Sequence, residues 1–234
     1  NYIRIKNARQ KFAERLRLNT SISHEIRTPL TLIKGPVNAL ATDTAFPEAQ
    51  RANLQLAQKN IQKLEAIISQ FIDFQKSGFD KFQMQVKNSD ILILIDEVIA
   101  SFTPLMKEKN IHFTYKRPSE SIVLLFDAEK MEKILNNLLS NAVKYTPSGK
   151  DISVEVIKDP KNLMLQVSDT GIGIPGQQQQ FLFKGYFRAE NTVNLKETGS
   201  GIGLNLAKEL VEMHHGKLHF SSEENKGSSF SFTI

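Results

Sequence analysis

The chain has 234 residues, enough for one or two domains, and its 40% hydrophobic and 24% charged residues are typical of a globular protein. The absence of cysteine excludes disulfides, thiolate zinc sites and cysteine nucleophiles. No apolar run reaches the roughly 18–20 residues that cross a bilayer, so we expect a soluble piece of a longer protein.

Residues 1–40 account for the positive excess in a net charge of +5, because eight Lys or Arg residues stand against only Glu14 and Glu25 there. The plain interpretation is a solvated helix face, and the alternative is a segment that meets an anionic membrane surface or an acidic partner. No nucleic-acid-binding motif accompanies the charge, so we expect no nucleic acid to bind.

The same segment is predicted to be a helix with a coiled-coil seam. Apolar residues follow alternating steps of four and three, with Asn19 and Ser23 as polar gaps: Phe12, Leu16, Ile26, Leu30, Ile33, Val37 and Leu40. After a loop near residues 42–47, a second helix over about 48–76 carries the same stripe in two phases: Leu54, Ile61 and Ile68, then Ala57, Leu64 and Phe71. One such hairpin buries little by itself, so we predict a homodimer whose two hairpins form a four-helix bundle.

A helix stop at Ser77-Gly78-Phe79-Asp80 separates residues 1–78 from a second domain at 79–234. The predicted order there is strand 82–87, helix 91–108, strands 111–116 and 122–125, helix 128–143, strands 151–157 and 163–168, a glycine-rich region, helix 202–214 and a hairpin 217–233. Strands 152–157 and 163–168 are expected to pair antiparallel across Asp159-Pro160. The fold class is therefore α+β.

His24 is the first residue along the chain whose side chain could take part in a reaction. On the predicted seam it takes an outward position, next to Glu25 and one turn before Thr28. Neutral imidazole is a good nucleophile near neutral pH, and a carboxylate that takes the proton of the other ring nitrogen raises its basicity. An exposed helical histidine beside glutamate is, however, most often ordinary surface.

A second cluster lies on helix 128–143 and its end. Asn137, Asn141 and Lys144 share one helix face, where two amide oxygens and an ammonium group could hold hydrated magnesium and its phosphates. A polar helix face without a ligand is the plainer interpretation of the two asparagines alone.

Two glycine-rich loops follow. Asp169-Thr-Gly171-Ile-Gly173 comes directly after a predicted strand, where glycines permit close backbone approach and a carboxylate can accept from an exocyclic amine such as that of adenine. Thr198-Gly199-Ser-Gly201-Ile-Gly203-Leu204 opens a helix, whose N-terminal amides would bind phosphate. Between them, Phe183, Tyr186, Phe187 and Arg188 interrupt a polar segment that is long enough to be a lid, or else form a small aromatic core.

In this order and spacing, Ser23-His24-Glu25-Ile-Arg-Thr28-Pro-Leu, the asparagine helix, both glycine loops and the aromatic segment resemble the transmitter core of sensor histidine kinases. The resemblance covers residues 14–234. It implies a dimerisation and histidine-phosphotransfer hairpin followed by an ATP-binding α/β sandwich of the Bergerat type. It also implies Mg²⁺ and ATP as cofactors and a response-regulator receiver domain as partner.

The resemblance further implies a role for each matching residue. His24 would accept the phosphoryl group, Glu25 would be its general base, and Thr28 would position water when the partner is dephosphorylated. Asn141 would bind Mg²⁺ with help from Asn137. The remaining residues would form the nucleotide pocket and its lid: Lys144, Tyr145, Asp169, Gly171, Gly173, Arg188, Gly199, Gly201, Gly203 and Leu204. The family pattern is broken by Gly185 and Tyr186, where a basic residue and Phe are usual.

Three other functions were weighed against this one. A simple ATP hydrolase of the same fold would carry Glu in place of Asn137, because an amide cannot take a proton from water. A scaffold with a vestigial pocket would not need Asn141, Asp169 and both glycine loops. An enzyme biased toward dephosphorylating its partner would use the same residues, and the sequence does not set that ratio. A sensor and a membrane segment are expected before residue 1, which would place the kinase core on the cytoplasmic side of the inner membrane.

Overall fold

The computed structural model describes residues 26, 29–42, 48–77, 84–159, 162–183, 187, 189, 191 and 201–234. The chain divides into two compact units, residues 1–81 and residues 82–234. Within the described ranges, no helix is both long enough and apolar enough to cross a membrane.

The first unit consists of two helices in its described part: residues 29–42 are helical, and α2 spans Glu48–Ser77. Part of each predicted apolar stripe is buried between the two helices. Leu30, Ile61 and Ile68 form a small core there, and Val37 packs against it. Polar contacts also join the helices, including the ion pair of Lys34 Nζ with Glu65 at 2.8 Å. The predicted helical hairpin is thus observed over its described residues.

The other phase of the stripe faces outward in the single chain. Its members keep between 40% and 53% of their surface exposed: Ile26, Ile33, Leu40 and Leu64. Three of them recur every seventh residue on the first helix. The hairpin therefore presents an apolar stripe that its own packing does not cover.

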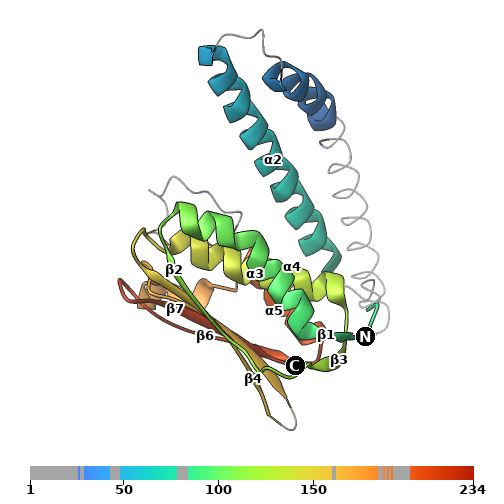
Figure 1. Cartoon of the computed structure of the whole chain (residues 1–234), viewed down its shortest axis with the longest axis vertical. Coiled ribbons are helices and arrows are strands. Elements are labelled where there is room, and N and C mark those ends of the chain that lie inside the picture. Colours follow the sequence, from blue (N-terminus) through green and yellow to red (C-terminus); the bar gives the residue numbers. More distant parts are fainter. Residues whose placement is uncertain are drawn as a thin grey trace, which may run out of the picture. The chain divides into compact units, whose positions relative to one another are not determined.

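The second unit is a layer of three helices on a mixed sheet (Figure 1). Its elements in chain order are β1 Lys87–Asp90, α3 Ile91–Glu108, β2 His112–Lys116, β3 Val123–Phe126, α4 Ala128–Tyr145, β4 Asp151–Lys158, β5 Leu163–Asp169, the 3-10 helix η1 Gly176–Phe181, α5 Gly203–Met213, β6 Lys217–Glu223 and β7 Gly227–Thr233. This is the predicted helical region followed by an α/β domain, and helix 91–108 has the predicted bounds.

The main sheet has five strands in the order β2-β4-β5-β7-β6. β2 runs parallel to β4, and all other neighbours are antiparallel. The expected pairing across Asp159-Pro160 is confirmed, since Ile157 lies opposite Met164. The expected C-terminal hairpin is confirmed in the pairing of β6 with β7.

One face of the sheet meets the helices, and the other faces outward. Alternate residues of the central strands point to the helices and are buried, including Val154, Leu165 and Phe232. Directly opposite partners on the outward face form a row of small hydroxyl side chains that crosses all five strands: Thr114, Ser153, Ser168, Ser229 and Ser221. The two-layer arrangement follows from this alternation.

The first predicted strand was wrong in its position. We expected a strand over 82–87, but residues 84–86 are not in a strand, and β1 begins at Lys87 and pairs with β3 in a separate two-stranded sheet. Val86 is 46% exposed and so does not pack into the core. The backbone N–H of Gln85 instead donates to Asp127 Oδ2 at 2.8 Å, which replaces a strand hydrogen bond with a side-chain one.

The three helices begin in different ways. Asp90 caps α3 by accepting from the backbone N–H of Leu92, and Asp127 caps α4 by accepting from that of Lys130. α5 begins after Ile202, with no side-chain hydrogen bond at its cap. The first N–H groups of α5 are therefore those best suited to receive acceptor atoms from elsewhere.

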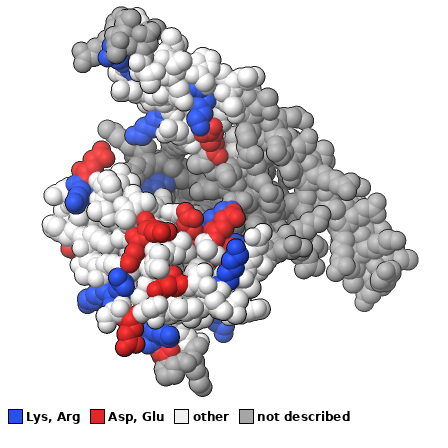
Figure 2. Space-filling model, turned by 45° about the vertical axis from the view of Figure 1, so that its right-hand side comes forward, with Lys and Arg blue, Asp and Glu red and all other residues white. Residues whose placement is uncertain are grey.

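Charged side chains of both signs are interspersed on the face shown in Figure 2. Many form surface ion pairs, such as Arg117 with Asp96 at 3.2 Å. Pairs of this kind contribute little to stability because water screens them. The pair of Lys130 with Asp127 differs, because both side chains are buried.

Candidate functional site

The polar face of α4 carries the predicted asparagine cluster. Asn137, Asn141 and Lys144 are each half-buried, whereas the opposite face of the helix is packed into the core by Leu135 and Leu138. The amphipathic spacing of α4 thus directs three polar side chains to one side. They sit along the second half of the helix, which ends at Tyr145.

The orientation of Asn137 is set by its own helix. Its Nδ2 donates to the carbonyl of Lys133 at 2.8 Å, which leaves Oδ1 directed toward α5. A Cβ on Gly203 would lie 2.3 Å from that Oδ1, so any larger residue where α5 begins would have to displace the Asn137 side chain. An amide oxygen and the uncapped N-terminus of α5 therefore lie side by side, one suited to a cation and the other to an anion.

Asp169 ends β5, and its carboxylate is held in place by backbone groups. Oδ1 accepts from the N–H of Gly171 at 2.8 Å and from that of Ser228 at 3.3 Å. Burial raises the pKa of Asp169, and these two hydrogen bonds only partly oppose that effect. No hydrogen bond to Oδ2 is found among the described residues, so this oxygen is the one that can accept from a ligand.

The first glycine loop packs closely against the end of α4. The N–H of Ile172 donates to the carbonyl of Tyr145 at 3.1 Å, and a Cβ on Gly171 would lie 2.3 Å from the same oxygen. Gly173 has a φ of +62°, and a Cβ there would meet the carbonyl of Glu223. We expected these glycines to admit a ligand, and the structure gives a second reason, the close approach of protein backbone on both sides.

Lys144 and Tyr145 lie at the point where α4 meets this loop. Lys144 Nζ is 5.0 Å from the centre of the Tyr145 ring, within the range of a cation–π contact. Lys109 Nζ donates to the carbonyl of Val143 at 3.0 Å and so caps the end of α4. Positive charge is thereby concentrated at the C-terminus of this helix.

The aromatic segment is anchored to the sheet unit in its described part. Phe183 packs edge-on against Phe220 of β6 with ring centres 5.5 Å apart, and Phe187 lies 5.8 Å from Phe181. The alternative of a small aromatic core is therefore observed for Phe183 and Phe187. The lid stays a prediction, because most of that segment lies outside the described residues. Phe181, in η1, was not among the aromatics named from the sequence.

Several predicted site residues lie outside the described residues: His24, Glu25, Thr28, Arg188 and Gly199. Of the second glycine loop, Gly201 has a φ of +71°, and Leu204 packs against the core of the sheet unit. In the described part of the chain, no group of three or more His, Cys, Asp or Glu side chains could hold a metal ion.

Sequence reasoning missed three residues that shape this site. Ser228 supplies a backbone N–H to Asp169, and Gly227, with a φ of +119°, lets β7 come close enough to do so. Asn191 Nδ2 donates to the carbonyl of Gly173 at 3.0 Å and ties the segment after the aromatics to the first glycine loop. The glycine at 227 was a visible signal, but a lone Asn191 was not.

These contacts place the end of β5 and the first glycine loop at the end of α4, and the start of α5 beside Asn137 two turns earlier on the same helix. This part of the unit offers a carboxylate oxygen at the sheet, two amide oxygens and an ammonium group on α4, and the N-terminal N–H groups of α5, which has no side-chain hydrogen bond at its cap. An adenine ring and a polyphosphate have the matching groups, an exocyclic amine and several anionic oxygens. The arrangement is therefore suited to a nucleotide.

Comparison with known families gives two matches. Residues 14–79 match the His Kinase A (phospho-acceptor) domain, and residues 126–234 match the histidine kinase-, DNA gyrase B-, and HSP90-like ATPase family. His24 lies within the first range, and Asn137 and Asp169 lie within the second.

Similar curated proteins include histidine kinase P4 of Formosa agariphila, 30% identical over 94% of this chain and 16% of that protein. Autoinducer 2 sensor kinase/phosphatase LuxQ of Vibrio cholerae is 31% identical over 98% of this chain and 27% of its own length. Sensor histidine kinase WalK of Bacillus subtilis is 29% identical over 94% and 36%, respectively. The chain thus spans much less than two thirds of each of these relatives.

Solved structures share the fold. Full-length ShkA in complex with AMPPNP has a TM-score of 0.77 at 23% identity, covering 93% of this chain and 45% of that one. Histidine kinase ThkA in complex with response regulator protein TrrA has a TM-score of 0.65 at 21% identity, covering 100% and 66%.

Proposed function

Because this chain belongs to the sensor histidine kinases, we propose that it transfers the γ-phosphoryl group of Mg-ATP to His24 and then to an aspartate of a response-regulator receiver domain. Residues 1–78 would be the phosphotransfer hairpin, and residues 79–234 the ATP-binding domain. The observation that carries the proposal is the meeting of Asp169, the polar face of α4 and the uncapped start of α5 around one position.

In the proposed complex, the Oδ2 atom of Asp169 accepts from the exocyclic amine of adenine. Gly171 and Ser228 hold the other carboxylate oxygen, so the acceptor is oriented before the nucleotide arrives. Tyr145 packs near the adenine, and Gly173, Gly199, Gly201 and Leu204 shape the pocket and its lid. The phosphates reach the start of α5 at Gly203, where N–H groups and the helix dipole favour anions.

Magnesium fits the residues on α4. Asn137 directs Oδ1, and not Nδ2, toward the start of α5, and Asn141 lies one turn away on the same face. Amide oxygens are ligands that Mg²⁺ accepts beside water and phosphate. We propose Asn141 as the principal ligand and Asn137 as its assistant, with the bound ion neutralising phosphate charge.

The chemistry is a balanced phosphoryl transfer. A ring nitrogen of His24 forms a bond to the γ-phosphorus as the bond from that phosphorus to the bridging oxygen breaks, and ADP leaves with the electron pair. Glu25 takes the proton from the other ring nitrogen. Lys144 and Arg188 balance charge on the transferred group, because positioning and charge neutralisation, more than covalent activation, drive such reactions.

The second transfer passes the group from the phosphoramidate of His24 to the aspartate of the partner. The complex of ThkA with the response regulator TrrA supports a partner of this class. We also propose that Thr28 positions water when the same surface dephosphorylates the partner. The name of LuxQ, a sensor kinase/phosphatase, supports this second activity.

We propose that the hairpin dimerises. Ile26, Ile33, Leu40 and Leu64 form an apolar stripe that the single chain leaves open, and a second hairpin with the same stripe would cover it. For the full-length protein we propose a sensor before residue 1 and a position on the cytoplasmic side of the inner membrane.

The decisive experiment is incubation of the protein with γ-labelled ATP and Mg²⁺. We expect acid-labile, base-stable label on the wild-type chain and none on His24→Gln. The matched control is His219→Gln, which removes an exposed histidine of β6 and should keep the label. Label retained in His24→Gln would place the acceptor elsewhere and refute the assignment.

A second measurement separates the kinase from a scaffold with a vestigial pocket. A fluorescent ATP analogue should bind the wild-type chain more tightly with Mg²⁺ than without it. Asn141→Ala should remove most of that difference, because it removes the proposed ligand. No binding under either condition would favour the scaffold.

A further inference from the structure

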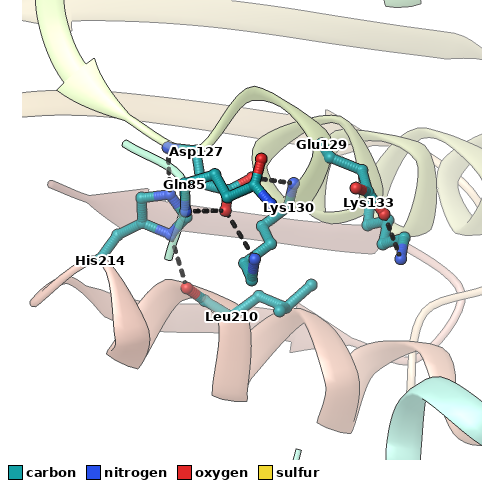
Figure 3. Close-up of polar contacts among 7 residues, drawn as sticks. All are labelled: Gln85, Asp127, Glu129, Lys130, Lys133, Leu210 and His214. Carbon is teal, nitrogen blue, oxygen red and sulfur yellow. Dashed lines mark hydrogen bonds and ion pairs between the residues drawn. The ribbon is translucent and has the colours of Figure 1, made fainter. Parts of the chain in front are cut away.

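A polar cluster around a buried carboxylate lies at the end of α4 that is remote from the proposed nucleotide position. We call it the Asp127 cluster, and it consists of Asp127, Lys130, His214 and the backbone N–H of Gln85 (Figure 3). Asp127 Oδ1 accepts from the N–H of Lys130 at 3.1 Å, and Oδ2 accepts from Lys130 Nζ at 2.6 Å and from Gln85 at 2.8 Å. One carboxylate thus binds the start of α4 and the segment that leads into β1.

The burial of this cluster makes its contacts significant. Asp127 is 2% exposed and Lys130 is 7% exposed. Burial opposes ionisation of Asp127, but the hydrogen bonds from Lys130 and Gln85 outweigh it and hold the pKa of Asp127 below its ordinary value. A buried, fully bonded carboxylate has few alternative geometries, so it positions what it holds.

His214 connects the backbone of Asp127 to the C-terminal end of α5. Its Nε2 accepts from the backbone N–H of Asp127 at 3.2 Å, and its Nδ1 donates to the carbonyl of Leu210 at 2.8 Å (Figure 3). These two bonds require a neutral ring with its proton on Nδ1. The ring therefore bridges the start of α4 and the last turn of α5.

Both ends of α5 contact α4, one at the middle of α4 and the other at its start. At one end, Gly203 of α5 lies against Asn137 of α4, and at the other, His214 binds Asp127. Ten residues of α4 and eleven of α5 separate these points, about 15 and 16 Å at 1.5 Å per residue. The two contacts are thus separated by nearly equal lengths of α4 and of α5. A shift of α5 along α4 that breaks one contact would therefore also displace the other.

We propose that Asp127 and His214 are positioning residues that hold α5 in register on α4 and so keep Gly203 against Asn137 in the nucleotide site. This inference rests on the proposed function, because the experiments measure the affinity for nucleotide. Gln85 brings the segment that follows residues 78–83 to the same carboxylate. A change in that segment would therefore reach α4 through Asp127 and not through the nucleotide site.

The first test replaces His214 in the 234-residue chain and measures the affinity of a fluorescent ATP analogue with Mg²⁺. His214→Phe keeps a flat ring but removes both nitrogens, and we expect about three- to tenfold weaker binding. His214→Gln retains an acceptor and a donor and should restore binding to within about twofold. His215→Asn is the matched control, because it removes the neighbouring histidine and keeps a residue that tolerates positive φ.

The second test asks whether the two ends are coupled. Gly203→Ala should weaken the analogue strongly in the wild-type background, because a Cβ would displace Asn137. In the His214→Phe background, Gly203→Ala should weaken binding of the analogue by a factor that is at least about threefold smaller, because α5 can then move away. Sites so far apart normally act independently, so non-additivity is the specific signature of a shared register.

The outcomes separate the inference from the proposed function. If the wild-type chain binds no nucleotide, the proposed function fails. If it binds and His214→Phe binds equally well, or if the effects of Gly203→Ala and His214→Phe add, the positioning role is refuted. If His214→Phe does not fold, as judged by circular dichroism, the comparison moves to His214→Gln and His214→Asn. The shorter Asn should then bind more weakly than Gln, and equal binding would overturn the inference.

Discussion

The hairpin and the sheet unit are stabilised in different ways. The sheet unit buries one continuous core from its helices and its five-stranded sheet. The described part of the hairpin buries a small cluster of Leu30, Ile61 and Ile68, and leaves large apolar side chains such as Ile33 half exposed. We therefore expect the hairpin to gain stability chiefly from the proposed dimerisation, and the sheet unit to fold by itself.

The largest expected effect comes from the core of the sheet unit. Phe232→Ala removes a fully buried ring from β7 and should lower the free energy of unfolding by about 3–5 kcal/mol. Urea unfolding followed by circular dichroism should give this loss at any protein concentration. Ser231→Ala, on the outward face of the same strand, is the control and should change little. A strong concentration dependence in the sheet transition would contradict the comparison.

The next effect should appear in association of the hairpin. Ile33→Asp combined with Leu40→Asp places charges in the apolar stripe and should weaken the dimer by at least about a hundredfold. Sedimentation equilibrium measures the change. Leu32→Asp is the matched control, because Leu32 is 71% exposed and lies beside the stripe but outside it. Equal disruption by the control would show that the stripe is not the interface.

A smaller effect concerns the pocket of the sheet unit. Burial raises the pKa of Asp169, so its ionised form lowers stability, and this penalty grows as pH rises above the ordinary Asp pKa of about 3.9. Asp169→Asn should therefore raise the melting temperature at pH 7 and do so less at pH 4. The same variant should weaken binding of the ATP analogue by about tenfold or more, because an amide donor replaces a carboxylate acceptor. A melting temperature that falls equally at both pH values would refute this.

The smallest effect is expected where α5 ends. His215 has a φ of +60°, a left-handed conformation that costs free energy for any residue with a Cβ. His215→Gly should stabilise the sheet unit by about 0.5–1 kcal/mol and leave the hairpin transition unchanged. Asn225→Gly, at a φ of +62°, should gain less because asparagine tolerates this region better. Destabilisation by His215→Gly would mean that its side chain has a role beyond the turn.

Much of the sheet unit could be predicted from local pattern. Helix 91–108 and the pairing of β4 with β5 follow from capping residues, periodicity and the turn at Asp159-Pro160, all of which are local. The position of β1 could not be predicted, because a distant carboxylate, that of Asp127, takes the hydrogen bond of Gln85. Long-range partners of this kind leave no mark in the neighbouring sequence.

The same division holds for the site. Asn137, Asn141 and Asp169 could be identified because each stands at a characteristic spacing from glycines or from another polar residue. Asn191 and His214 could not, since each acts on a backbone group far away in the chain, Gly173 in one case and Asp127 in the other. Sequence pattern thus identified the groups that we propose to contact a ligand and missed those that hold such groups in place.

The row of hydroxyl side chains on the outward face of the sheet has a consequence for how this unit meets other proteins. Ser153, Ser168 and Ser229 are short and polar, so water can hydrogen-bond to this face. Stripping that water without matched partners costs free energy, so the face disfavours lasting adhesion. The proposed phosphoryl transfer requires this unit to dock and withdraw repeatedly, and one broad side that does not adhere would favour that cycle.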